Sequence, residues 1–239
     1  MIEPVFNEND IVIYQADCLD VMDQFKPKSF DLLVTDPPYG VNFKSNKSSN
    51  FDWIINDSPS DRDEVDIRIT KALKSLREAR HFYIFGEWDY SHLTAARTEI
   101  IWDKQIIGMG ALECPWGPAH EKIWFGTTCS SAANIKKGYG KLSARMRKGS
   151  IISEDRKTGL GAKRHPTEKP VNILRQLIES SSVIGDTVFD PFMGVGSTLI
   201  ASIIEGRNAV GIEICQEYVD IAIERVRKAQ KILRELYSM

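Results

Sequence analysis

The stretch that decides the fold is Phe189-Asp190-Pro191-Phe192-Met193-Gly194-Val195-Gly196-Ser197-Thr198, which follows a short strand-like run. Two glycines separated by one residue after a strand predict a tight turn whose backbone amides face a ligand. A lone G-x-G pair is a weak signal, because it lacks the third glycine of the dinucleotide-binding pattern. Its flanks strengthen it: Asp190 closes the strand, and a second strand ends in Glu213 about 20 residues after the turn, where a carboxylate suits the hydroxyls of a ribose. These flanks weaken the alternative, a turn that binds no nucleotide beside a solvated Glu213.

Strand-like apolar runs alternate with helix-like segments through the rest of the chain. The runs expected to be strands are 11–15, 31–35, 81–86, 99–103, 122–126, 188–190 and 209–213. The segments with apolar residues at helical spacing are 66–79, 170–181 and 216–237. This alternation predicts an α/β protein whose mostly parallel sheet is covered by helices on both faces.

Composition limits the class of protein. With 239 residues, of which 42% are hydrophobic and 27% charged, the chain is long enough for one α/β domain and is not expected to be disordered. A net charge of −2 gives no global sign of a nucleic-acid partner, so any basic surface must be local. Cysteines and histidines are scattered, so neither a disulfide framework nor a metal site is expected, and a reducing cytoplasm fits best. We expect no signal peptide and no membrane span, since no apolar run approaches ~18 residues.

A second motif, Asp36-Pro37-Pro38-Tyr39, follows the apolar run 31–35. An exocyclic amino group of a nucleobase is a poor nucleophile, because its lone pair is delocalised into the ring. Asp36 and the Pro37 carbonyl offer acceptors for its two N–H groups, Pro38 stiffens the turn, and Tyr39 offers a flat face for an extruded base. Alone, this tetrapeptide is as well explained by a rigid surface turn. Its place after a strand, in a chain that also carries the glycine turn, favours the functional interpretation.

The chain resembles the β-group amino-methyltransferases of DNA. The resemblance is carried by the two motifs together with His165-Pro166-Thr167-Glu168-Lys169-Pro170 and Gly211-Ile212-Glu213-Ile214. This resemblance implies a doubly wound, mostly parallel, seven-stranded Rossmann-like methyltransferase sheet, circularly permuted so that the target-base half comes first. It implies a single methyltransferase domain over 1–239 with a small target-recognition insertion at 128–164. The order of the motifs separates the chain from methylases of protein glutamine, whose Asn-Pro-Pro-Tyr follows the glycine turn.

The resemblance also implies S-adenosyl-L-methionine as the cofactor. In that family, the equivalents of 190–196 wrap the methionine end, the equivalent of Glu213 holds the ribose, and the position of Asp17 reaches the adenine end. Lys169 is the expected charge partner of the methionine carboxylate. The residues expected to bind the cofactor are Asp17, His165, Thr167, Lys169, Asp190, Pro191, Phe192, Gly194, Gly196, Ser197, Thr198 and Glu213.

Two long polar segments interrupt the pattern of strands and helices. Residues 136–164 contain ten Lys or Arg against two acidic residues, where the family keeps its target-recognition region. A solvated charged loop is the plain alternative to DNA binding. The side chains expected to contact DNA are Lys136, Lys137, Lys141, Arg145, Arg147, Lys148, Arg156 and Lys157. In the other segment, 41–57, Trp53 either closes over a flipped base or packs in the core.

The predicted reaction is methyl transfer from S-adenosyl-L-methionine to the N6 amino group of adenine in DNA, by base flipping and direct transfer. Aspartate at the first position of the tetrapeptide favours adenine in the family, so N4-cytosine is the near alternative. RNA methylation and a non-catalytic DNA-binding protein are more distant ones. Cys114-Pro115 reverses the order typical of C5-cytosine enzymes. A homodimer is left open, and any restriction endonuclease partner is expected on a separate chain; a solitary or phage methylase fits equally well.

Overall fold

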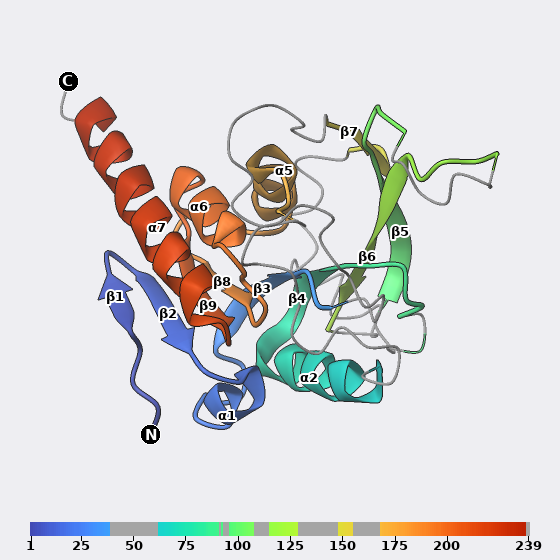
Figure 1. Cartoon of the computed structure of the whole chain (residues 1–239). Helices are drawn as coiled ribbons and strands as arrows, with labels where there is room; N and C mark the ends of the chain where they lie inside the picture. Colours follow the sequence, from blue (N-terminus) through green and yellow to red (C-terminus); the bar gives the residue numbers. More distant parts are fainter. Residues whose placement is uncertain are drawn as a thin grey trace.

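The central feature of the fold is a mixed sheet with the strand order β1-β2-β9-β8-β3-β4-β6-β5-β7 (Figure 1). The computed structural model describes residues 1–38, 62–90, 92, 96–107, 115–128, 148–154 and 168–237. The strands within these residues are β1 (Phe6–Glu8), β2 (Ile11–Gln15), β3 (Phe30–Thr35), β4 (Leu76–Phe85), β5 (Ala96–Asp103), β6 (His120–Thr127), β7 (Ile151–Ser153), β8 (Thr187–Asp190) and β9 (Asn208–Glu213). The helices are α1 (Cys18–Met22), α2 (Arg62–Ser75), α5 (Val171–Ser181), α6 (Ser197–Ile204) and α7 (Gln216–Tyr237).

Five neighbouring strands, β2, β9, β8, β3 and β4, run parallel to one another. Strand β6 runs antiparallel to both β4 and β5, so its amino end lies at the same edge of the sheet as the carboxyl ends of the parallel strands. Ligands of open α/β sheets bind at that edge.

Helices cover both faces of the sheet, as the buried side chains of β3 show. Leu32 and Val34 belong to a core cluster with residues of α5, whereas Leu33 packs in a cluster with residues of α1 and α2. Alternate residues of a strand point to opposite faces, so an apolar strand of this kind must be covered twice. Helices α6 and α7 lie beside α5 on its side of the sheet (Figure 1). The predicted doubly wound arrangement is confirmed.

The sheet has nine strands among the described residues, where seven were expected. The additional strands, β1 and β7, are three residues long, too short for a periodic pattern to show. Strand β7 pairs with β5 and lies inside 128–164, so this part of the expected insertion extends the sheet. The helix expected over 66–79 begins at Arg62 and ends at Ser75, and residues 76–79 belong to β4. Pairing of Leu76 with Phe30 of β3 overrides the local helical spacing there.

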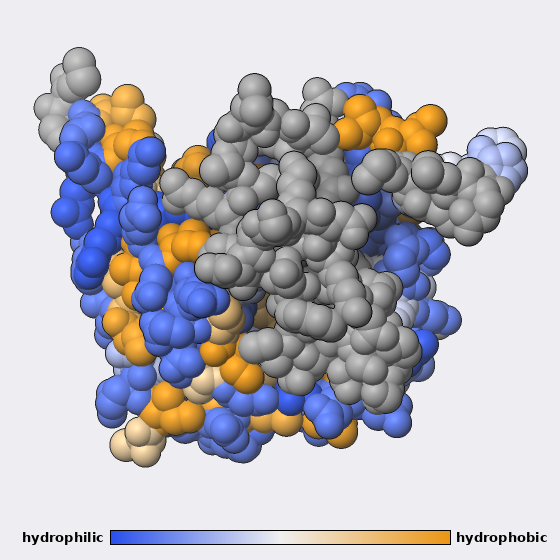
Figure 2. Space-filling view, in the orientation of Figure 1, coloured by the Kyte–Doolittle hydropathy of each residue, from blue (hydrophilic) through white to orange (hydrophobic). Residues whose placement is uncertain are grey.

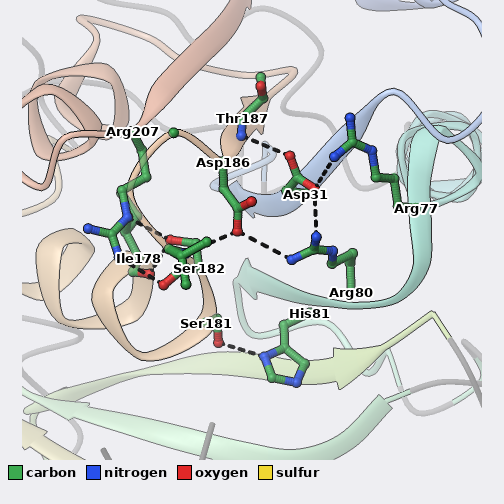
Figure 3. Close-up of polar contacts among 12 residues, drawn as sticks. Asp31, Arg77, Arg80, His81, Ile178, Ser181, Ser182, Asp186, Thr187 and Arg207 are labelled. Carbon is green, nitrogen blue, oxygen red and sulfur yellow. Dashed lines mark hydrogen bonds and ion pairs between the residues drawn. The ribbon is translucent and has the colours of Figure 1, made fainter. Parts of the chain in front are cut away.

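A buried polar cluster joins β8, β3 and β4 near their amino ends (Figure 3). Asp31 is almost fully buried and accepts bonds from Arg77 at 2.6 Å and from the Thr187 amide at 3.0 Å. Arg80 lies 3.0 Å from Asp31 and 3.2 Å from Asp186. Every oxygen of the Asp31 carboxylate is thereby satisfied, as a buried charge requires. The cluster ties together the three strands whose opposite ends carry the candidate site.

The described part of the face seen in Figure 2 carries mostly hydrophilic side chains with scattered hydrophobic ones. None of the described helices combines the length and the apolarity needed to cross a bilayer.

Candidate functional site

The two sequence motifs meet at the carboxyl ends of β3 and β8. These strands are parallel neighbours, with Leu32 opposite Val188 and Leu33 opposite Phe189. The hydroxyl of Thr35, the last residue of β3, donates a 2.8 Å hydrogen bond to the carboxylate of Asp190, the last residue of β8. One hydrogen bond therefore links the residue before the Asp36 tetrapeptide to the start of the glycine turn.

The glycine turn has the backbone shape that its sequence predicts. Gly194 and Gly196 have φ values of 51° and 77°, in the left-handed region that glycine adopts without steric cost. Among the described residues, a Cβ on Gly194 would meet no atom within 4 Å, so on their side this residue borders open space. A Cβ on Gly196 would lie 3.0 Å from the Cβ of Ala222, because α7 packs against the turn. Gly196 is thus required for packing, and Gly194 leaves room for a ligand.

Glu213 closes the turn from the neighbouring strand β9. One of its carboxylate oxygens accepts a hydrogen bond from the Gly194 amide at 3.0 Å, and the other accepts one from the Cys215 amide at 2.8 Å. Burial raises the pKa of Glu213 despite these backbone donors. These two hydrogen bonds fix the shape of the turn. The contact of Glu213 with a ribose stays a prediction.

Asp190 is the most deeply buried acid of the candidate site, with 3% of its surface exposed. Burial raises its pKa to about 7, against the opposing effect of hydrogen bonds from Thr198, Thr35 and the Phe192 amide. The Phe192 amide lies 3.1 Å from the carboxylate. Asp190 therefore holds both β3 and its own turn in place, and it titrates near neutral pH.

Asp17 follows β2, next to β9 in the sheet. It caps α1 by accepting a 2.8 Å hydrogen bond from the Leu19 amide, and it forms a 2.9 Å ion pair with Arg68 of α2. Burial acts to raise the pKa of Asp17, but the bonds from Arg68 and Leu19 outweigh it and lower the pKa. Since Gln15 pairs with Glu213, the ends of β2, β9, β8 and β3 each carry an acid, in the order Asp17, Glu213, Asp190 and Asp36.

Asp36 is paired with a buried lysine. The Lys169 ammonium lies 2.6 Å from one oxygen of Asp36 and 3.3 Å from a carboxylate oxygen of Glu121, on β6. Burial acts to lower the pKa of Lys169, but the two carboxylates outweigh it and the pKa is raised. Pro37 is buried and Pro38 half-buried beside this pair. The predicted contact of Lys169 with a methionine carboxylate stays a prediction.

An ionic clamp, formed by Glu168, Ser197 and Arg225, attaches the segment before α5 to the glycine turn. The Glu168 carboxylate pairs with the guanidinium of Arg225 on α7 and accepts a 3.3 Å hydrogen bond from Ser197. Arg225 also donates a 2.6 Å hydrogen bond to the carbonyl of Val195. Sequence reasoning missed Arg225, because its position on an amphipathic helix carries no motif, and it gave Glu168 and Glu121 no site role.

Several predicted site residues lie outside the described residues. These are Tyr39, His165, Thr167, Lys136, Lys137, Lys141, Arg145, Arg147, Arg156 and Lys157. Lys148, the remaining expected DNA contact, is exposed and lies 3.6 Å from Glu179 of α5. Its contact with DNA stays a prediction.

Comparison with known proteins agrees with this geometry. A family described as DNA methylase, the N6/N4 methyltransferases, matches residues 30–224. The chain is 26% identical over 269 aligned residues to type II methyltransferase M2.MboI of Moraxella bovis, covering 99% of this chain and 96% of that protein.

Two solved structures share the fold. The M1.HpyAVI–SAM complex has a TM-score of 0.65 at 19% identity, covering 90% of this chain and 98% of that one. The cytosine-N4-specific PvuII DNA methyltransferase has a TM-score of 0.70 at 14% identity, covering 96% and 94%. The predicted Rossmann-like methyltransferase fold is thereby confirmed. Since the family match spans most of its length, this chain belongs to the N6/N4 DNA methylase family.

Proposed function

We propose that this protein transfers a methyl group from S-adenosyl-L-methionine to the N6 amino group of adenine in DNA. One observation carries the proposal: the Asp36 tetrapeptide and the Gly194 turn end adjacent parallel strands and are bridged by the 2.8 Å bond between Thr35 and Asp190. An acceptor for an amino group and a cofactor-type turn therefore share one edge of the sheet.

The residues present suit the cofactor. The open space over Gly194 is where the cofactor's methionine end would lie against the turn. Glu213, at the end of the next strand, would contact the ribose, and Asp17, which follows the strand after that, would contact the adenine end. The name of the M1.HpyAVI–SAM complex, a protein with the same fold, supports this assignment.

When bound, the cofactor would supply an electrophilic methyl group to the amino nitrogen, and the proton that this nitrogen loses would pass to Asp36, which accepts a hydrogen bond from it. Asp36 and the Pro37 carbonyl accept hydrogen bonds from the amino N–H groups. These bonds draw the nitrogen out of conjugation and stabilise the positive charge that develops on it. The remaining contribution is positioning of the two reactants, with no covalent intermediate on the protein.

Adenine is the favoured base because Asp36 occupies the first position of the tetrapeptide, which in the resembling family is typical of N6-adenine enzymes. The cytosine-N4 specificity of the PvuII enzyme, whose fold is the same, supports N4-cytosine as the second candidate. Both reactions use the same acceptor and the same direction of methyl transfer. The basic segment within 128–164, including Lys148, is proposed to contact the DNA phosphates.

The test is mass spectrometry of nucleosides from mixed-sequence DNA incubated with the protein and cofactor, with Asp36→Ala alongside. We expect N6-methyladenine from the native protein and a loss of about 100-fold or more in the variant, the scale for removing one well-placed donor or acceptor. N4-methylcytosine would keep the mechanism and replace the base. Methylated RNA but unmodified DNA, or no methylated base despite cofactor binding, would refute the proposal.

A further inference from the structure

Four charged side chains form a line at the edge of the sheet that carries the candidate site; we call it the charge line. It runs from Lys104 through Glu121 and Lys169 to Asp36. The Lys104 ammonium lies 2.8 Å from one oxygen of Glu121, and the Lys169 ammonium lies 3.3 Å from its other oxygen and 2.6 Å from Asp36. Charges alternate along the line, so each inner member contacts an opposite charge on both sides.

The order of the strands produces the charge line. Asp36 follows β3, Glu121 lies in β6, and Lys104 follows β5. In the sheet, β4 lies between β3 and β6, and β5 is next to β6. Trp102 is paired with Glu121 across β5 and β6, and the Lys104 amide donates a 2.9 Å hydrogen bond to Ala119. The backbone therefore fixes Lys104 and Glu121 relative to each other.

Aromatic rings support the two ammonium groups. Lys169 lies over the ring of Phe85, 5.4 Å from its centroid, and Lys104 lies over the ring of Trp102 at 5.6 Å. Both distances are within the range of cation–π attraction. The ammonium groups are thus held from two directions, which restricts the orientations they can adopt.

Burial of the charge line carries a desolvation cost in the free energy of folding. The side chains of Lys169 and Lys104 are 6% and 10% exposed, and Glu121 is 19% exposed. Buried ion pairs often stabilise a protein no better than apolar side chains of the same volume, since the charges must be desolvated. Burial opposes the charged form of Glu121, but Lys169 and Lys104 outweigh it and lower its pKa. Stability alone therefore gives no reason for four charges that end at the proposed catalytic carboxylate.

We propose that Glu121 and Lys104 are positioning residues for methyl transfer, which hold Lys169 against Asp36 so that this carboxylate stays ionised and fixed in orientation. An ammonium at this distance favours an ionised carboxylate, and only that form accepts hydrogen bonds at both oxygens. Glu121 supplies the second carboxylate that fixes the position of the Lys169 ammonium at Asp36, and Lys104 contacts Glu121 in turn. This inference rests on the proposed function, because it assigns roles relative to Asp36.

The test is the single-turnover rate of methyl transfer to DNA, measured with cofactor affinity and DNA affinity in the same variants. Glu121→Gln keeps the size of the side chain and removes its charge. We expect its rate to fall about 100-fold, the loss that a misplacement of about 1 Å can cause. Cofactor and DNA affinities are expected to stay close to those of the native protein. Glu99→Gln is the matched control, because Glu99 forms a more exposed 3.9 Å pair with Lys122 on the same two strands; it should retain the native rate.

Lys104 provides an independent test. Lys104→Met should lower the rate about 10-fold, and Lys104→Arg should restore most of it, because the charge returns. Lys104→Met added to Glu121→Gln should cause little further loss, since residues that act as a unit are not additive. A merely structural role would lower the melting temperature without this pattern in the rate.

The outcomes separate the inference from the proposed function. Native rates in both Glu121→Gln and Lys104→Met, in a protein that methylates DNA, would overturn the inference and leave the proposed function intact. A native protein that binds cofactor and methylates no DNA would overturn the proposed function itself. If Glu121→Gln fails to fold, the Lys104→Met and Lys104→Arg rates decide: a loss that arginine rescues supports the inference, and an unchanged rate in Lys104→Met rejects it.

Discussion

Replacing Gly196 with alanine should destabilise the protein through two separate effects. Gly196 has φ 77°, and an L-residue in this left-handed region costs about 1–2 kcal/mol. The new Cβ would also lie 3.0 Å from the Cβ of Ala222 on α7, and overpacking of this kind typically costs about 1–3 kcal/mol. Together these effects predict a loss of about 2–5 kcal/mol in the free energy of unfolding.

Urea denaturation of matched variants separates the two effects. Gly194→Ala shares the positive φ, at 51°, but its Cβ would meet no atom of the described part of the chain within 4 Å, so it should lose only about 1–2 kcal/mol. Adding Ala222→Gly to Gly196→Ala removes the contact between the two Cβ atoms. The double variant should regain part of the lost unfolding free energy, although glycine within a helix itself costs about 1 kcal/mol. Cofactor titration should show weaker binding in Gly194→Ala, whose new methyl group enters the proposed site. Equal stability of Gly196→Ala and the native protein would refute this account of the turn.

Three further predictions concern the residues that hold the site together. Asp190→Asn should flatten the pH dependence of stability. In the native protein, buried Asp190 has a pKa of about 7 and stays protonated, whereas in the unfolded chain this side chain ionises above about pH 3.8. The free energy of unfolding of the native protein should therefore fall relative to that of the variant as the pH rises from 4 to 7. This change in the stability difference between the two proteins reaches at most about 4 kcal/mol and is constant above pH 7. Parallel curves of unfolding free energy against pH, measured by urea titration, would contradict the prediction. Thr35→Val removes the donor to Asp190 and should cost about 1–3 kcal/mol, more at pH 8 than at pH 5.5, and an equal loss at both would count against the bridge. Arg225→Met should weaken cofactor binding in calorimetry, because Glu168 and the turn lose their clamp; unchanged affinity would show that the clamp is dispensable.

The part of the fold that sequence predicted best is the part with strong periodicity or a motif. The long terminal helix was predicted over the residues that form α7, because apolar side chains recur on one face through six turns. The doubly wound sheet followed from the family resemblance. The carboxyl end of α2 and the start of β4 were misplaced, because Leu76 fits the helical spacing and only its pairing with β3 makes it a strand residue.

The missed site residues share a physical reason. Each of them acquires its partner only when elements distant in sequence pack together. They are Arg225, Glu168, Glu121 and Lys104. A charged residue at the start of an apolar strand, such as Glu121, is expected from sequence to lie in solvent at the end of the strand. The strand order determines that it instead lies next to Lys169.

The central claim is that the Asp36 tetrapeptide and the Gly194 turn form one active site. A crystal structure of the protein with S-adenosyl-L-methionine tests it most directly. We predict that the methionine portion lies along 190–196, that the ribose hydroxyls contact Glu213, and that the transferable methyl group faces Asp36. A cofactor bound elsewhere, or bound at the turn with its methyl group directed away from Asp36, would contradict the account.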